Sequence, residues 1–259
     1  IITCKWGVNK LSEIRFWWIR HAPVIGNDGR CYGNNDVDCD VSDRDSYKAL
    51  ANILPKDASV YSSHLSRTIK TMNATVDEGF NYKDYAVDAN FGEQNLGEWQ
   101  GLKYEKLQEK TKELGIFHPT WLCSPEYTPP QGESYNNLYQ RVTLGINKIV
   151  ENKKEGDVVI FSHGGPIKAA IAHAIKADPS YTLPFWIDNL ALSRFDFIDG
   201  VCRVRFINLL PKIISNLLLK FVRSFNGRNT NLIGHFFGRA PFKKTSFKKS
   251  YLGLSKNIK

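Results

Sequence analysis

The sequence has no C-x-x-C pair and no apolar run of the roughly 20 residues that a transmembrane helix needs. Its five cysteines are scattered along the chain, which argues against a structural zinc site and against a disulfide framework. The simplest interpretation is a cytoplasmic protein with reduced thiols. The sequence also lacks any cluster of metal-binding residue types, so it gives no reason to expect a bound metal.

Acidic residues are missing from the C-terminal part of the chain. Residues 211–259 hold 11 of the 35 lysines and arginines and none of the 26 aspartates and glutamates. Residues 1–210 keep 24 basic and 26 acidic residues, so their net charge is −2 against +11 for the tail. Any affinity for acidic partners is therefore expected from the tail alone.

Short apolar runs alternate with segments of helical periodicity, a pattern typical of an α/β domain. We predict a three-layer α/β/α sandwich around a mostly parallel sheet of about six strands, with a catalytic-type domain over 1–210 and an extension over 211–259. The predicted strands are 13–19, 58–61, 85–91, 157–161, 191–198 and 201–209, and the predicted helices are 42–54, 65–78, 104–114, 134–150 and 166–177. Residues 115–132 are predicted to be an irregular cover.

Two helix starts carry local signals. Ser42, followed by Asp45 three residues later, resembles a capping box at the start of the first helix. Pro166 suits the first position of its helix, because its missing N–H would have no intrahelical acceptor there.

Polar or ionisable residues follow the ends of several predicted strands. In open α/β sheets the carboxyl ends of parallel strands form the ligand-binding edge, so these side chains are expected to converge there. For each residue taken alone, a structural role or a surface ion pair is the more common one, and it is the joint pattern that indicates a site. The residues are Arg20, His21, Ser63, Arg67, Glu93 and His163.

Five motifs in order along the chain resemble the histidine phosphatase (phosphoglycerate-mutase-like) superfamily. The resemblance covers residues 13 to about 209. The motifs are Arg20-His21 with Asn27, residues 62–71 with Arg67, Gly92-Glu93 with residues 96–101, Gly132-Glu133-Ser134 with Arg141-Val142, and Ser162-His163-Gly164-Gly165.

The resemblance implies that His21 attacks phosphorus and forms a phosphohistidine, which suits an imidazole that is partly neutral near pH 7. It implies that Arg20, Arg67 and His163 hold the phosphoryl oxygens, since arginine stays charged and matches phosphate geometry. Glu93 would protonate the leaving oxygen and then activate water.

The same resemblance assigns substrate binding to Asn27, Ser63 and Gly164, with Gly164 letting the backbone approach the phosphate. It implies no metal and no other cofactor, because cationic side chains neutralise the phosphate instead. The family usually has Gly-Glu-Ser or Gly-Glu-Thr after the nucleophilic histidine. Here residues 22–24 are Ala-Pro-Val, so one hydroxyl of the usual pattern is lost.

The expected activity is hydrolysis of a small phosphomonoester. The segment from Cys31 to Asp36 is similar to a stretch of alpha-ribazole phosphatases, and sugar-phosphate phosphatases share it. Phosphoglycerate mutase activity is the alternative, but mutases of this family usually have Asn where Gly165 stands. A non-catalytic binding module is a third possibility, and no obligate protein partner is implied.

The tail begins with apolar residues at helical spacing between Leu210 and Phe225, with lysines and an arginine among them. This pattern predicts an amphipathic basic helix followed by a basic end. A helix packed on the domain is one interpretation. Contact with an anionic membrane surface, or weak binding of nucleic acid, is the other.

Overall fold

The computed structural model describes residues 12–153, 155–215 and 217. Backbone contacts divide the chain between Pro211 and Lys212. Most of the predicted tail, residues 216 and 218–259, lies outside the described residues, so its amphipathic helix and its partners stay predictions. The description below concerns the first unit.

Six strands form one mixed sheet in the order β3-β2-β4-β1-β5-β6. The strands β1 to β4 pair in parallel, whereas β5 runs antiparallel to both of its neighbours, β1 and β6. The predicted mostly parallel sheet is therefore confirmed. The strands are β1 Glu13–Arg20, β2 Ala58–Ser62, β3 Tyr82–Val87, β4 Gly156–Ser162, β5 Leu192–Ile198 and β6 Val201–Leu209.

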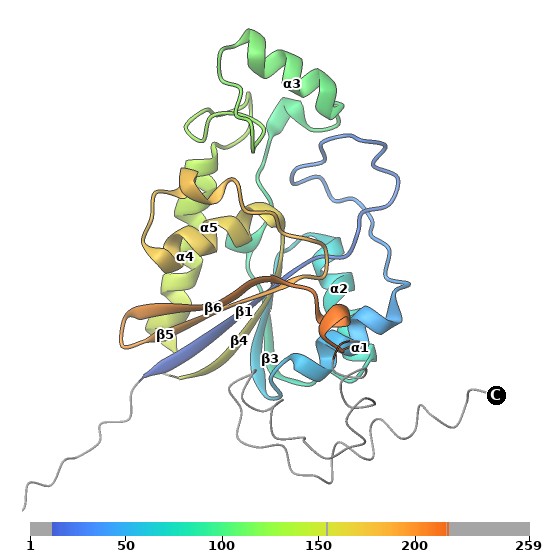
Figure 1. The fold of residues 1–259 in the computed structure, drawn as a ribbon, viewed down its shortest axis with the longest axis vertical. Helices are drawn as coiled ribbons and strands as arrows, with labels where there is room; N and C mark the ends of the chain where they lie inside the picture. Colours follow the sequence, from blue (N-terminus) through green and yellow to red (C-terminus); the bar gives the residue numbers. More distant parts are fainter. Residues whose placement is uncertain (1–11, 154, 216, 218–259) are drawn as a thin grey trace, which may run out of the picture. The chain divides into compact units, whose positions relative to one another are not determined.

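Helices cover both faces of this sheet, which makes the predicted three layers (Figure 1). In β1 the side chains of Phe16 and Trp18 pack with α4 and α5, and those of Trp17 and Ile19 pack on the opposite face with α1 and α2. Burial on both faces explains the continuous apolar run of this central strand. The helices are α1 Arg44–Ile53, α2 Ser66–Asp77, α3 Tyr104–Glu113, α4 Tyr135–Asn152 and α5 Gly164–Ile175.

The third strand was predicted three residues too late. It begins at Tyr82 and ends at Val87, and the 3₁₀ turn η1 (Ala89–Phe91) follows. The Asp88 carboxylate accepts the Asn90 backbone N–H and so starts this turn. Phe91, whose apolar side chain led to the prediction of a longer strand, is buried edge-on against Trp18, with the ring centroids 5.4 Å apart. The turn delivers residue 93 to the sheet edge.

Two helix starts also differ from the prediction. The N-cap of α1 is Asp43, whose carboxylate accepts the Ser46 N–H at 3.3 Å, so Ser42 lies outside the helix. The α5 helix begins at Gly164, and Pro166 is its third residue. A proline is tolerated there because the N–H groups of the whole first turn lack intrahelical acceptors.

A small second core lies under α3, at the end of the sheet where the parallel strands terminate (Figure 1). It contains Leu96, Trp99 and Leu107, with Tyr127 stacked on Trp99 at 5.4 Å. Gly97 has φ +51°, and a Cβ there would lie 2.0 Å from the Pro130 carbonyl oxygen, so only glycine fits. The segment predicted as an irregular cover forms part of this core, together with the 3₁₀ turn η2 (Gly97–Trp99).

Candidate active site

Two histidines meet where the neighbouring parallel strands β1 and β4 end. His21 follows β1 and His163 follows β4. The backbone N–H of His21 donates to the Ser162 carbonyl at 3.0 Å. Both side chains are fully buried, and their ring centroids lie 5.0 Å apart. The pairing of two adjacent strands in the sheet thus fixes the spacing of the two imidazoles.

The His21 ring is held by its Nδ1, which lies 2.6 Å from the carbonyl oxygen of Ala22. A proton on Nδ1 satisfies this contact and leaves a lone pair on Nε2. Within the described residues Nε2 is buried and has no hydrogen-bond partner. Burial, followed by the charges of Arg67 and Arg20, lowers the His21 pKa well below its usual value. This ring is therefore neutral at pH 7 and keeps the lone pair on Nε2.

Arg67 lies beside the second histidine and is fully buried. Its Nε donates to His163 Nδ1 at 3.2 Å, and its Nη atoms donate to the carbonyls of Asn35 and Gly33 at 2.7 and 2.9 Å. Because His163 Nδ1 accepts, its Nε2 carries the proton. Burial, with the charges of Arg67 and Arg20 adding to it, lowers the His163 pKa well below its usual value.

Arg20 is the last residue of β1, and one of its Nη atoms donates to the Ile187 carbonyl at 2.5 Å. Its Nε is buried without a hydrogen-bond partner among the described residues. Together with Arg67 it places a second fixed positive charge close enough to lower the pKa of His21. Two guanidinium groups next to two neutral imidazoles form a cluster whose chemistry suits a phosphoryl group.

Glu93 arrives at this edge from the turn after η1, and its carboxylate lies against the start of α5. One oxygen accepts the Gln94 N–H at 3.0 Å, and the other is 3.5 Å from the Gly165 nitrogen. A Cβ on Gly165 would lie 2.4 Å from Glu93 Oε1, whereas a Cβ on Gly164 would make only ordinary contacts with Arg20 from 3.8 Å. The tight contact is therefore at Gly165, and the predicted approach of the Gly164 backbone to a phosphate stays a prediction.

Sequence reasoning quoted Glu133 and Arg141 in a motif but gave them no role. Arg141 pairs with the Glu133 carboxylate at 2.7 and 3.0 Å and donates to the carbonyls of Asn90 and Glu93 at 2.8 and 3.0 Å. Glu133 also accepts the Asn95 N–H at 2.9 Å. This ion pair clamps both sides of the Glu93 turn and makes Arg141 a positioning residue.

A buried lysine near the site was also missed. Lys168 on α5 is 8% exposed, donates to the Leu183 carbonyl at 2.8 Å, and places its ammonium 4.3 Å from the centre of the Trp121 ring. Burial lowers its pKa to about 8, against the opposing effect of Glu93. The available signal was a single charged residue in the otherwise apolar helix that follows His163.

Asn27 and Ser63 use their side chains locally. The side-chain oxygen Oδ1 of Asn27 accepts the backbone N–H groups of Gly29 and Arg30 at 2.8 and 3.3 Å, which closes a turn. Ser63 Oγ accepts the Leu65 N–H at 3.2 Å, just before α2. Among the described contacts none joins either side chain to the two histidines. Their predicted roles in substrate binding stay predictions.

Neither a metal centre nor a membrane segment emerges from the described part of the chain. No group of three or more His, Cys, Asp and Glu side chains there is arranged to hold a metal ion. None of its helices combines the length and apolar character needed to cross a bilayer.

The site matches a known family. The model of the histidine phosphatase superfamily (branch 1) matches residues 16–210, which include every residue of the site described above. The chain belongs to this superfamily. The resemblance drawn from the five sequence motifs is thereby confirmed.

Relatives within this superfamily differ in what their names describe. The bifunctional protein Rv2228c of Mycobacterium tuberculosis is 32% identical over 126 residues, and the match covers 48% of this chain but only 34% of that protein. Phosphoserine phosphatase 1 of Hydrogenobacter thermophilus is 29% identical over 179 residues, covering 68% of this chain and 82% of the relative.

Solved structures show the same fold at lower identity. The alpha-ribazole phosphatase of Shigella flexneri superposes with a TM-score of 0.63 at 22% identity, over 75% of this chain and 96% of that one. At this identity the likeness concerns the fold.

The contact between Gly165 and Glu93 can be tested with two matched variants. In Gly165→Ala the new methyl group displaces the Glu93 carboxylate, and a misplacement of about 1 Å costs catalysis ~10²-fold. We expect kcat to fall by about that factor, and to fall less in Gly164→Ala, whose methyl group meets only ordinary contacts. Steady-state kinetics with para-nitrophenyl phosphate measures both, with melting temperatures to verify folding. Equal losses in the two variants would contradict this assignment.

The buried histidines predict a pH dependence of stability. Their pKa values in the folded state lie well below the 6.5 of a free histidine, so the unfolded chain binds more protons once the pH falls below 6.5. The free energy of unfolding should be steady above pH 7 and then fall by up to about 1.4 kcal/mol per pH unit per histidine. Urea denaturation at pH 7.5, 6.5 and 5.5 tests this.

The matched control for this measurement is the double variant His21→Asn, His163→Asn, which keeps polar side chains of similar reach. In this variant the free energy of unfolding should fall much less between pH 6.5 and 5.5. A small decline should remain, because burial also lowers the pKa of His173. A profile as steep as that of the unmodified protein would show that other groups cause the decline.

Proposed function

We propose that this protein is a metal-independent phosphomonoester hydrolase that acts through a phosphohistidine on a small phosphorylated metabolite. The observation that carries the proposal is His21, a buried neutral imidazole whose Nε2 has no partner among the described residues and faces a second imidazole 5.0 Å away, centroid to centroid. Two guanidinium groups flank the pair.

In the first step the lone pair of His21 Nε2 forms a bond to phosphorus, and the bond from phosphorus to the ester oxygen breaks. Arg20, Arg67 and the Nε2–H of His163 hold the phosphoryl oxygens, where the charge of the transition state is spread. The Glu93 carboxyl gives its proton to the leaving oxygen, so the alcohol departs neutral.

In the second step Glu93, now a carboxylate, takes a proton from water as its oxygen attacks the phosphohistidine. The bond between phosphorus and His21 Nε2 breaks, and its electron pair returns to the nitrogen. The products are inorganic phosphate and the starting enzyme with Glu93 protonated. Arg141 serves both steps by fixing the turn that carries Glu93.

Hydrolysis is favoured over mutase activity by the packing at position 165. The Glu93 carboxylate occupies the space in which a side chain of that residue would begin. The asparagine usual at this position in mutases would require the end of the Glu93 side chain to move. Relatives that are named as phosphoglycerate mutases keep the alternative open to test.

For the substrate we propose alpha-ribazole 5'-phosphate or a sugar phosphate. The support is the name of the Shigella flexneri neighbour and the Cys31–Asp36 segment. That segment contacts the proposed phosphate-binding residue Arg67. Gly33 and Asn35 accept from Arg67, and the Tyr32 ring lies 5.1 Å beneath its guanidinium. The segment thus holds Arg67, a proposed phosphate-binding residue, in place. Any influence of the segment on which substrate is chosen is therefore indirect.

We further propose a cytoplasmic location and an enzyme domain over residues 1–210, with a tail that contacts anionic membrane surfaces or nucleic acid. Support for the location comes from the free thiols of Cys31, Cys39, Cys123 and Cys202. The charge of +11 over residues 211–259 supports the tail contact. Salt-dependent cosedimentation with phosphatidylserine vesicles is the direct test of the membrane contact, and salt-dependent DNA binding tests the other.

Replacing the nucleophile tests the proposed chemistry. His21→Ala should lose at least ~10³-fold in hydrolysis of para-nitrophenyl phosphate, because the proposed attacking nitrogen is removed. The unmodified protein, quenched during turnover of a ³²P-labelled substrate, should carry label on one histidine, and the variant none. His118→Ala in the cover is the control and should keep its activity. Activity of His21→Ala near that of the unmodified protein would refute the mechanism.

The products separate a hydrolase from a mutase. With 3-phosphoglycerate as substrate we expect free phosphate and no 2-phosphoglycerate, with or without EDTA, because the fixed cations of Arg20 and Arg67 neutralise the phosphoryl group. Phosphate release and isomer content can be measured on the same sample by ³¹P NMR. Interchange of the isomers without net release would assign the mutase activity instead, and loss of activity with EDTA would implicate a metal.

A further inference from the structure

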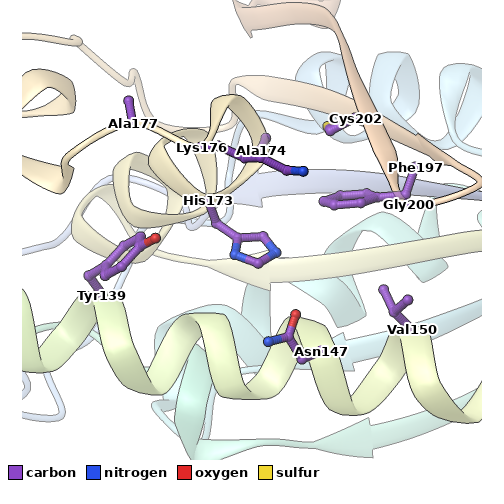
Figure 2. Close-up of a pocket in the computed structure, with 10 residues that line it drawn as sticks. All are labelled: Tyr139, Asn147, Val150, His173, Ala174, Lys176, Ala177, Phe197, Gly200 and Cys202. Carbon is purple, nitrogen blue, oxygen red and sulfur yellow. The ribbon is translucent and has the colours of Figure 1, made fainter.

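A cavity of about 420 Å³ lies away from the two histidines, between α4, α5 and the β5–β6 hairpin (Figure 2). It is reached at the carboxyl end of α5, whereas His163 caps the amino end of the same helix. The ten residues from His163 to His173 span about 15 Å of helix. The cavity is therefore separate from the proposed catalytic site.

Polar side chains from two neighbouring helices line this cavity. Tyr139 and Asn147 come from α4 and His173 comes from α5, and Figure 2 shows the His173 ring pointing toward the Asn147 amide. In the described part of the chain no hydrogen bond is recorded for any of these three side chains. They offer donors and acceptors that no other described residue uses, and Asn147 is exposed at the surface.

The cavity carries a positive charge without a negative one. Lys176, the left-handed residue that ends α5 with φ +53°, lines it, and none of the lining residues is acidic. Burial lowers the pKa of the His173 ring, and the nearby Lys176 ammonium lowers it further. A neutral His173 beside an unbalanced Lys176 favours an anion over a cation.

The remaining wall is apolar and aromatic. The His173 and Phe197 rings lie 5.8 Å apart at an angle of 32°, and Phe197 is itself held edge-on by Phe16 at 5.3 Å. Ala174 and Ala177 add apolar surface without filling the space. This wall of two adjacent rings, tilted by 32°, offers apolar surface to a flat ring of a ligand.

We propose that this cavity is a second ligand site, which binds a flat aromatic molecule with one acidic group, a carboxylate or sulfonate. The ligand's ring packs along His173 and Phe197. Its acidic oxygens accept from Lys176, and Asn147 and Tyr139 complete the hydrogen bonds. The volume suits a ligand of one or two fused rings, since it falls at the lower end of the range of small-molecule sites.

The test uses two fluorescent probes of similar shape, 8-anilinonaphthalene-1-sulfonate and its uncharged analogue N-phenyl-1-naphthylamine. The full-length folded protein should bind one equivalent of the sulfonate saturably. Lys176→Met should weaken this binding about tenfold, the worth of one charge-assisted hydrogen bond, and leave the neutral probe unchanged. Ala177→Phe should abolish binding of both probes by filling the cavity.

Lys148→Met is the matched control, because Lys148 is an exposed lysine of α4 that does not line the cavity. It should bind both probes as the unmodified protein does. Far-ultraviolet circular dichroism and melting temperature establish that each variant is folded. Equal weakening by Lys148→Met and Lys176→Met, or unchanged binding in Ala177→Phe, would overturn the proposal, since the sulfonate would then lie elsewhere.

Discussion

The edge of the sheet that carries the two histidines depends on the hydrogen bonds of the buried Arg67 guanidinium. It joins three segments that are distant in the sequence, because it donates to His163 after β4 and to the carbonyls of Gly33 and Asn35 in the loop after β1. These acceptors are all neutral. Burying a charge is costly unless hydrogen bonds satisfy it, so each of these contacts is needed to keep the cation in place.

The same arrangement determines how the imidazoles behave. Burial and the nearby cations keep both rings neutral, so a phosphoryl anion meets fixed positive charge from the arginines and directed hydrogen bonds from the rings. Little reorganisation is needed when the ligand enters, because every group is already held by the backbone or by another side chain. The Arg141–Glu133 pair extends this order to the turn that carries Glu93.

The sequence allowed much of this site to be predicted, because its strands are apolar runs that stop abruptly. His21 and His163 follow such runs, and the parallel pairing of β1 with β4 brings them together as expected. Glu93 was placed at the right edge, but through a supposed strand end; in fact the Asp88-capped turn delivers it.

What could not be predicted depends on where side chains point. The oxygens of Asn27 and Ser63 accept local N–H groups, an orientation that no sequence pattern shows, and the roles predicted for their donor groups stay predictions. Gly165 differs from Gly164 only in which atom its missing Cβ would meet, a three-dimensional property. The cavity beside His173 depends on two helices and a hairpin whose packing no local pattern describes.

The close fit of Glu93 against Gly165 also bears on how this protein can evolve. The atom that a new side chain at position 165 would meet is the end of the flexible Glu93 side chain, so the carboxylate can move while the turn held by Arg141 and Glu133 stays in place. A lineage can therefore acquire a residue there in one step, but that step moves the proposed acid from its present position. Keeping the carboxylate in place beside a larger residue would take a second, compensating replacement.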